Sequence, residues 1–496
     1  MKQMRGTLPT LLALTALAAG CASRPPLPEP PAGQRLTECR QLLARVDAVV
    51  ADAGVSDAQS ARIAGFPQLR VNRFLAAEPV KPAPQSPAFG PWAARLAALA
   101  AEARRVELAN LPAEAARGLA PRPALRRQVE ACRDRLTEAD LGSPERRQAL
   151  RAAARVPPEY QTWKRVAGLY PLTALAFRVG IERWHADTHE TFGVPLDALP
   201  VSGRLLRYRP PEGQRLSREQ LSAILGRSTD NPLGILDPRG EDRARLLHHF
   251  APVLEVDTAG PGDRVGRPYL IGRRQVEVHR HHPVVYTHIS HARLAGRSLL
   301  QLHYVFWFPA RRLTGPLDLL GGKIDGITWR VTLGPAGRPL LWDTMHNCGC
   351  YHMFIPNRAA LRQVNDGGIY QEPPLVPQTL SDPALPLVLR IAHHTHYLQR
   401  VYPDPAAGAP AIPYELADYQ QLRSLPLPGG GRASLFRPDG IVPGSERRER
   451  WLFWPMGVPL PGAMRQLGHH ATAFVGRRHF DDPDLVERYF RLRQTP

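Results

Sequence analysis

The residues with the clearest capacity for chemistry are crowded into the stretch "HNCGCYH", residues 346–352. Within it, His346, Cys348, Cys350 and His352 recur at every second position. Imidazole nitrogen together with thiolate sulfur favours zinc or copper over magnesium. The pattern therefore predicts a zinc or copper site to which these four side chains contribute.

One straight strand cannot supply all four ligands, because six residues of strand span about 20 Å. Tetrahedral zinc needs each ligand within about 2.0–2.3 Å. Either the chain turns at Gly349 so that Cys348 and Cys350 converge, or histidines from elsewhere complete the site. Eleven of the 18 histidines fall between His279 and His396, and we expect His303 or the 393–396 group to take part.

Two other interpretations of the cysteine pair stay open. Cys348 and Cys350 form either a structural disulfide or a strained, labile redox disulfide. Alternatively one thiol is a nucleophile activated by His346 or His352. Asp325, which follows a glycine-rich turn, is a candidate ligand or general base, or else a turn residue that bonds its own backbone. The sequence contains no G-x-S-x-G, H-E-x-x-H or P-loop motif, so the common hydrolase and NTPase signatures are absent.

The N-terminal sequence indicates where in the cell the protein is located. Basic residues 2–5 precede an apolar run at 8–19, and Ala18-Ala19-Gly20-Cys21 resembles the lipobox of bacterial lipoproteins. That resemblance implies removal of a signal peptide, residues 1–20, and lipid attachment at Cys21, palmitate included. Ala22 rather than Asp follows the cysteine, which implies the outer membrane of the cell envelope. Residues 21–34 are proline-rich and are expected to be an extended tether.

The chain has 496 residues, 43% of them hydrophobic, and a formal net charge of +19. The basic residues are scattered rather than arranged in a stripe with aromatics, so nucleic acid is not an expected partner. A positive surface instead favours anionic lipid headgroups or acidic glycans. The expected partners are the membrane, through the anchor at Cys21, and an envelope component or glycan.

Residues 35–195 are predicted to form a helical domain. Apolar positions step by three and four in several segments, which is the pattern of one buried helix face. Cys39 lies on the stripe of 36–50 and Cys132 on that of 125–136. We predict a Cys39–Cys132 disulfide, the alternative being two free core cysteines. Closing such a loop stabilises the fold by about 4 kcal/mol in the chain-entropy view.

Residues 200–480 are predicted to form a β-rich domain, an antiparallel sheet or sandwich with long loops. In 299–308, Leu302 and Phe306 belong to one face, whereas His303 and Trp307 belong to the other. The stretch "LGPAGRPL" predicts a hairpin turn, and 481–496 a C-terminal helix. The expected fold class is therefore α+β.

Three functional hypotheses follow. The first is an outer-membrane lipoprotein with a His/Cys metal site, which would be hydrolytic if an open coordination position activates water. The second is a non-enzymatic envelope binding or assembly protein with a structural CGC disulfide. The third is a thiol–disulfide redox protein. The sequence does not decide whether the chain is an enzyme.

Overall fold

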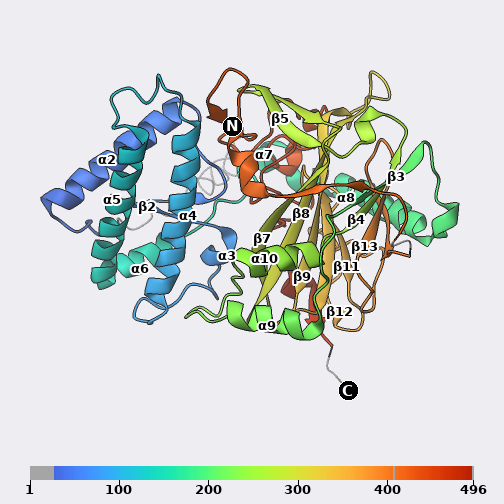
Figure 1. The fold of residues 1–496 in the computed structure, drawn as a ribbon, viewed down its shortest axis with the longest axis horizontal. Helices are drawn as coiled ribbons and strands as arrows, with labels where there is room; N and C mark the ends of the chain where they lie inside the picture. The colour runs from blue at the N-terminus through green and yellow to red at the C-terminus, as the bar shows by residue number, and fades with distance from the viewer. Residues whose placement is uncertain (1–26, 406–407, 494–496) are drawn as a thin grey trace, which may run out of the picture.

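The computed structural model describes residues 27–405 and 408–493, which fold into helices followed by a β-rich region (Figure 1). The α+β class is therefore confirmed. Figure 1 shows the first helices as a group beside the β-rich body. The predicted signal peptide and the predicted lipidation site Cys21 lie outside the described residues.

The helical group contains four main helices and a small hairpin. The hairpin and the short helix after it were not predicted, because their few apolar residues have no long periodic pattern. The elements are α2 (Gln34–Asp52), β1 (Ala61–Ile63), β2 (Phe66–Val71), α3 (Arg73–Ala76), α4 (Phe89–Asn110), α5 (Arg122–Gly142) and α6 (Pro144–Ala153).

The predicted Cys39–Cys132 disulfide joins α2 to α5. Both cysteines are buried in one apolar cluster with Leu43, Val46 and Leu136. The two helical stripes thus face each other as their periodicity predicts. The bridge spans 93 positions of sequence, so it removes much of the loop entropy of the unfolded chain.

The proline-rich tether is attached to the helical group over its last residues. The Arg146 guanidinium donates to the carbonyl of Pro28 at 3.1 Å, and Arg40 donates to that of Pro31 at 2.6 Å. Since proline carbonyls have no partner within an extended chain, these arginines fix the tether from Pro28 onward.

The larger sheet has six strands in the order β11-β10-β9-β8-β7-β16. All neighbours are antiparallel except β16, which runs parallel to β7. The predicted turn between residues 333 and 340 joins β9 to β10. The strands are β7 (Val284–Leu294), β8 (Arg297–Arg311), β9 (Gly322–Leu333), β10 (Pro339–His346), β11 (Met353–Pro356) and β16 (Glu415–Asp418).

A second sheet of five strands covers one face of the first. Leu302 and Phe306 of β8 share a core with Leu254 and Leu389 of the second sheet. Trp307 points to the opposite face and packs with residues of the C-terminal segment. The alternation expected for β8 is therefore observed. The five strands are β14 (Leu398–Pro403), β13 (Leu387–Ile391), β4 (Val253–Thr258), β3 (Arg204–Arg209) and β15 (Ile412–Pro413).

Four helices of different lengths pack together beside the large sheet. They are α7 (Thr162–Ala167), α8 (Tyr170–Gly193), α11 (Arg450–Phe453) and η4 (Trp454–Met456). At the end of the chain, helix α12 (Leu485–Tyr489) is shorter than the expected helix 481–496. The chain turns there into β19 (Phe490–Leu492), which pairs with β12 (Leu361–Gln363).

The other elements are α9 (Arg218–Ser228), α10 (Gly240–His249), β5 (Arg267–Gly272), β6 (Gln275–His279), β17 (Leu425–Pro426), β18 (Arg432–Ala433), η1 (Leu196–Ala198), η2 (Pro261–Asp263) and η3 (Tyr419–Arg423). None of the helices within residues 27–405 and 408–493 is both long and apolar enough to cross a bilayer.

Replacing both bridge cysteines, Cys39→Ser with Cys132→Ser, is expected to lower the free energy of unfolding by about 2–4 kcal/mol. Chemical unfolding followed by far-UV circular dichroism measures this loss. Cys350→Ser is the control, since that thiol takes no part in the bridge. Alkylation of Cys39 and Cys132 in the native protein without reductant would show that the bridge is absent.

Candidate functional site

The "HNCGCYH" stretch forms a tight turn between β10 and β11. The amide of His346 donates to the carbonyl of Cys350 at 3.0 Å, and that of Gly349 donates to the carbonyl of His346 at 2.7 Å. Gly349 has φ +93°, and a β-carbon there would lie 2.6 Å from the carbonyl oxygen of Ala471. Only glycine fits this position without strain, because it tolerates both the left-handed backbone and the close approach.

The turn brings the two thiols together. Cys348 and Cys350 are not bonded to each other, and the amide of Cys350 donates to the sulfur of Cys348 at 3.4 Å. The hydrogen bond to Cys348, followed by burial, raises the pKa of the Cys350 thiol well above its usual value. The guanidinium of Arg465 donates to the Cys348 carbonyl at 3.1 Å, which places a positive charge beside the pair.

Both thiols line a pocket of about 480 Å³. Its walls are mostly apolar and come from α8, from α11 and from residues 471–474. Phe177 of α8 packs edge-on against Phe453 of α11, with ring centroids 5.1 Å apart. Trp184 of α8 lies 5.2 Å from the ring of Tyr351. An apolar hollow with a few convergent polar groups is the usual form of a small-molecule site.

The polar residues that line this pocket include Tyr351, Tyr397 and Glu449. Glu449 is only 3% exposed, and this burial raises the pKa of its carboxyl group to about 7. The charge of this carboxylate acts on both Cys350 and Tyr351. A carboxyl group with a pKa near neutral pH is suited to general acid–base catalysis.

A buried chain of carboxylates and imidazoles lies behind the two tyrosines. Asp325 lies 3.7 Å from Nδ1 of His346 and 2.7 Å from Nδ1 of His396, whose Nε2 is 3.5 Å from Asp263. Burial lowers the pKa of His396, but the two carboxylates outweigh it and raise the value above the usual one. For His346 burial prevails and the pKa is lowered, so this ring is neutral at pH 7.

His346 connects this chain to the pocket. Its ring lies edge-on to Tyr351, with centroids 4.9 Å apart, and 5.5 Å from the ring of Tyr397. The predicted candidates Asp325 and His346 are therefore neighbours, close behind the thiols. Asp325 accepts a hydrogen bond from His396 and lies 3.7 Å from His346, so it is more than a turn residue.

The candidates His352 and His303 lie elsewhere, on the opposite face of the large sheet. His352 bonds Asp343 at 2.9 Å, and Arg330 holds the other oxygen of that carboxylate at 2.9 Å. His303 bonds Ser290 at 2.6 Å. The rings of both histidines pack edge-on against Phe480. These side chains are held in place by structural contacts.

The five predicted metal ligands are thus divided between two places. Within the part of the chain that the structure describes, no group of three or more His, Cys, Asp or Glu side chains is arranged to hold a metal ion. Zinc or copper at this stretch stays a prediction, and the geometry favours thiol chemistry instead.

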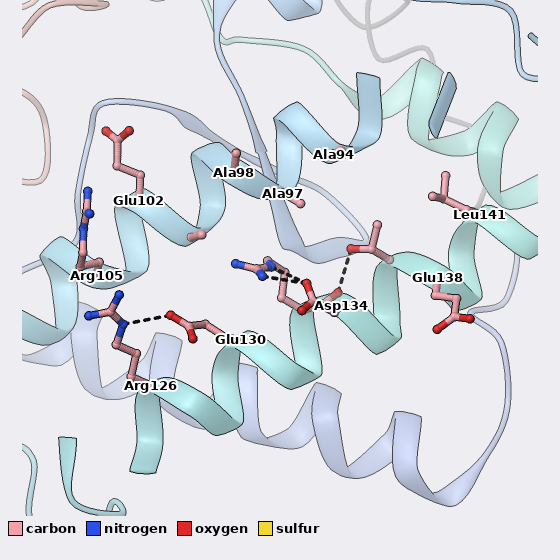
Figure 2. Close-up of a pocket in the computed structure, with 13 residues that line it drawn as sticks. Ala94, Ala97, Ala98, Glu102, Arg105, Arg126, Glu130, Asp134, Glu138 and Leu141 are labelled. Atoms are coloured by element: carbon pink, nitrogen blue, oxygen red, sulfur yellow. Dashed lines mark hydrogen bonds and ion pairs between the residues drawn. The ribbon is translucent and has the colours of Figure 1, made fainter. Parts of the chain in front are cut away.

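A second hollow, about 790 Å³ in volume, runs between α4 and α5. Figure 2 shows alanines of α4 facing charged side chains of α5 across it. Those charges satisfy one another, since Arg126 pairs with Glu130 at 2.9 Å and Arg133 with Asp134 at 2.7 Å. Neither cysteine nor histidine lines this groove, so the pocket beside α8 is the better candidate.

Comparisons with known proteins give no further guide. The chain matches no protein-family model, no curated protein and no solved structure.

Sequence reasoning missed two pocket residues, Glu449 and Tyr397. Glu449 belongs to "ERRERW", residues 446–451, whose charges are typical of a solvated surface. Its amide donates to the carbonyl of Leu319 at 3.0 Å, which draws the segment inward. No local pattern signals this contact between segments far apart in sequence.

Gly349→Ala is expected to destabilise the protein by more than about 1 kcal/mol, because it adds a steric clash to an unfavourable φ. Thermal unfolding measures the loss. Gly296→Ala is the matched control, with φ +77° and no atom within 4 Å of the added carbon. Equal losses for both variants would mean that the contact with Ala471 contributes nothing.

Proposed function

We propose that this protein is a lipid-anchored enzyme of the cell envelope that cleaves or transfers an acyl group through the thiol of Cys348. The observation that carries the proposal is the position of Glu449. A carboxyl group with a pKa of about 7 shares an apolar pocket with two adjacent thiols. The proposal also includes lipidation at Cys21 and location in the outer membrane, both of which the resemblance to a lipobox supports.

Cys348 is the better nucleophile of the two. The amide of Cys350 donates to its sulfur, and Arg465 lies beside it, so developing negative charge on that sulfur is stabilised. The raised pKa of Cys350 keeps the second thiol protonated at neutral pH. Cys350 therefore serves as a hydrogen-bond donor.

The proposed reaction has two steps. The Glu449 carboxylate accepts the thiol proton while the sulfur of Cys348 attacks the acyl carbonyl, and the leaving group departs with that proton. The resulting thioester is then cleaved by water, whose proton passes through Glu449 back to the thiol. The apolar walls of the pocket suit the hydrocarbon part of such a substrate.

Hydrolysis of p-nitrophenyl esters of increasing chain length tests the proposal. We expect kcat/KM to increase with chain length and to rise as pH passes about 7, because the base is the ionised form of Glu449. Glu449→Gln is expected to lower kcat/KM by a factor of about 10² or more and to remove the rise. Cys348→Ser is expected to abolish the activity.

The control is Glu446→Gln, which alters a nearby carboxylate paired with Arg437. It is expected to leave the pH profile unchanged. Hydrolysis that survives in Cys348→Ser, or an unchanged profile in Glu449→Gln, would overturn the assignment. Activity lost on chelation and restored by zinc would favour the metal hypothesis instead.

The adjacency of the thiols also favours a second candidate, a reversible Cys348–Cys350 disulfide. Intact-mass measurement after alkylation distinguishes the two. We expect two alkylated thiols in protein isolated from the cell envelope without reductant. No alkylation before reduction, with no ester hydrolysis after it, would favour a redox or structural disulfide.

A further inference from the structure

Helices α7 and α8 expose an unusual number of large apolar side chains. Six residues along them are between 43% and 68% exposed: Trp163, Val166, Leu169, Leu172, Leu175 and Val179. The exposed apolar residues of α8 and its pocket-lining residues lie on opposite faces of the helix. Phe177 and Ile181 belong to the face that lines the pocket. Burying such side chains in a nonpolar phase is favourable, so this face is expected to have an occupant.

Two other segments extend the apolar face. In α11, Trp451 is 72% and Leu452 is 55% exposed, and Leu452 also lines the pocket. In the loop after β8, Leu313 is 54% and Leu317 is 89% exposed, and Leu320 lines the pocket. Three segments that contribute residues to the pocket, α8, α11 and the loop after β8, therefore also carry exposed apolar side chains.

Cations accompany the apolar side chains. The ammonium of Lys164 lies 5.6 Å from the ring of Trp163, and the guanidinium of Arg450 lies 4.9 Å from that of Trp451. Arg448 is exposed between α11 and the loop after β8, where it donates to the carbonyl of Pro316. Tryptophan with a neighbouring cation is the side-chain combination that sits at a lipid–water interface.

We infer that the apolar face of α7, α8, α11 and the loop after β8 docks on an anionic lipid surface. Its tryptophans and leucines would enter the acyl region, while Lys164, Arg448 and Arg450 reach the headgroups. A second copy of the chain fits less well, because a two-fold interface would bring these cations face to face. Anionic headgroups attract them instead.

Docking in this orientation indicates the substrate class, which is an acyl lipid. Leu452 both lines the pocket and belongs to the apolar face, so a lipid acyl chain is expected to reach Cys348 along this side chain. This part of the inference, the acyl lipid as substrate, rests on the proposed function. The docking itself depends only on the exposed side chains and the cations.

Quenching of tryptophan fluorescence by brominated lipids tests the docking. Full-length acylated protein is placed in phosphatidylethanolamine–phosphatidylglycerol vesicles whose acyl chains carry bromine. We expect strong quenching, most of which is lost in the double variant Trp163→Phe, Trp451→Phe. The anchor holds every variant at the vesicle, so the difference reports insertion of this face alone.

A negative charge introduced into the apolar face is also expected to prevent its insertion into the bilayer. Leu172→Asp and Val179→Asp are each expected to lower the ratio of docked to undocked protein by at least about tenfold. Leu492→Asp is the control, since Leu492 is 46% exposed and belongs to β19, which pairs with β12 and is not part of the apolar face. These measurements use no thiol chemistry, so an inactive Cys348 would not affect them.

Quenching that is equal in the wild type and the double tryptophan variant would overturn the inference. So would sedimentation showing a dimer in the absence of lipid that Val179→Asp dissociates, because the face would then belong to a second copy.

Discussion

The backbone at Gly349 determines which side chains reach the pocket. Its left-handed φ and its contact with the carbonyl of Ala471 leave no room for another residue. The turn reverses the chain within a few residues and aligns β10 with β11 so that Thr344 pairs with Met353. In that register His346 shares a face with Tyr351, whereas His352 joins the opposite face. The thiols between them face the pocket.

Both faces of the large sheet are buried, and they differ in chemistry. One face packs on the second sheet through apolar side chains. The other carries Arg330, Asp343, His303 and His352, which are covered by the C-terminal segment around Phe480. Buried charges need partners, and the Arg330–Asp343 pair meets this requirement with His352 as a third member. Many of the clustered histidines therefore stabilise an interior that contains polar groups.

Local patterns predicted the parts of the fold that depend on local periodicity. The stripes holding Cys39 and Cys132, the alternation of β8 and the turn before β10 are all confirmed. For residues 346–352 a turn at Gly349 was one of two open alternatives, and the structure has that turn. Cys348 and Cys350 line the pocket beside α8, and Asp325 lies 3.7 Å from His346. Glu449 and Tyr397 were missed, because segments far apart in sequence bring them to the pocket.

The attachment of the tether to the helical group has a consequence for how the protein stands on its membrane. Arg146 holds the chain at Pro28, and Cys21 lies only seven positions before that point. Fully extended, seven residues reach roughly 25 Å. Once Cys21 is acylated, as the resemblance to a lipobox predicts, this short part of the tether keeps the protein close to the lipid surface. Its effective concentration at the surface is then so high that even a weak affinity of α8 for lipid suffices to set its orientation.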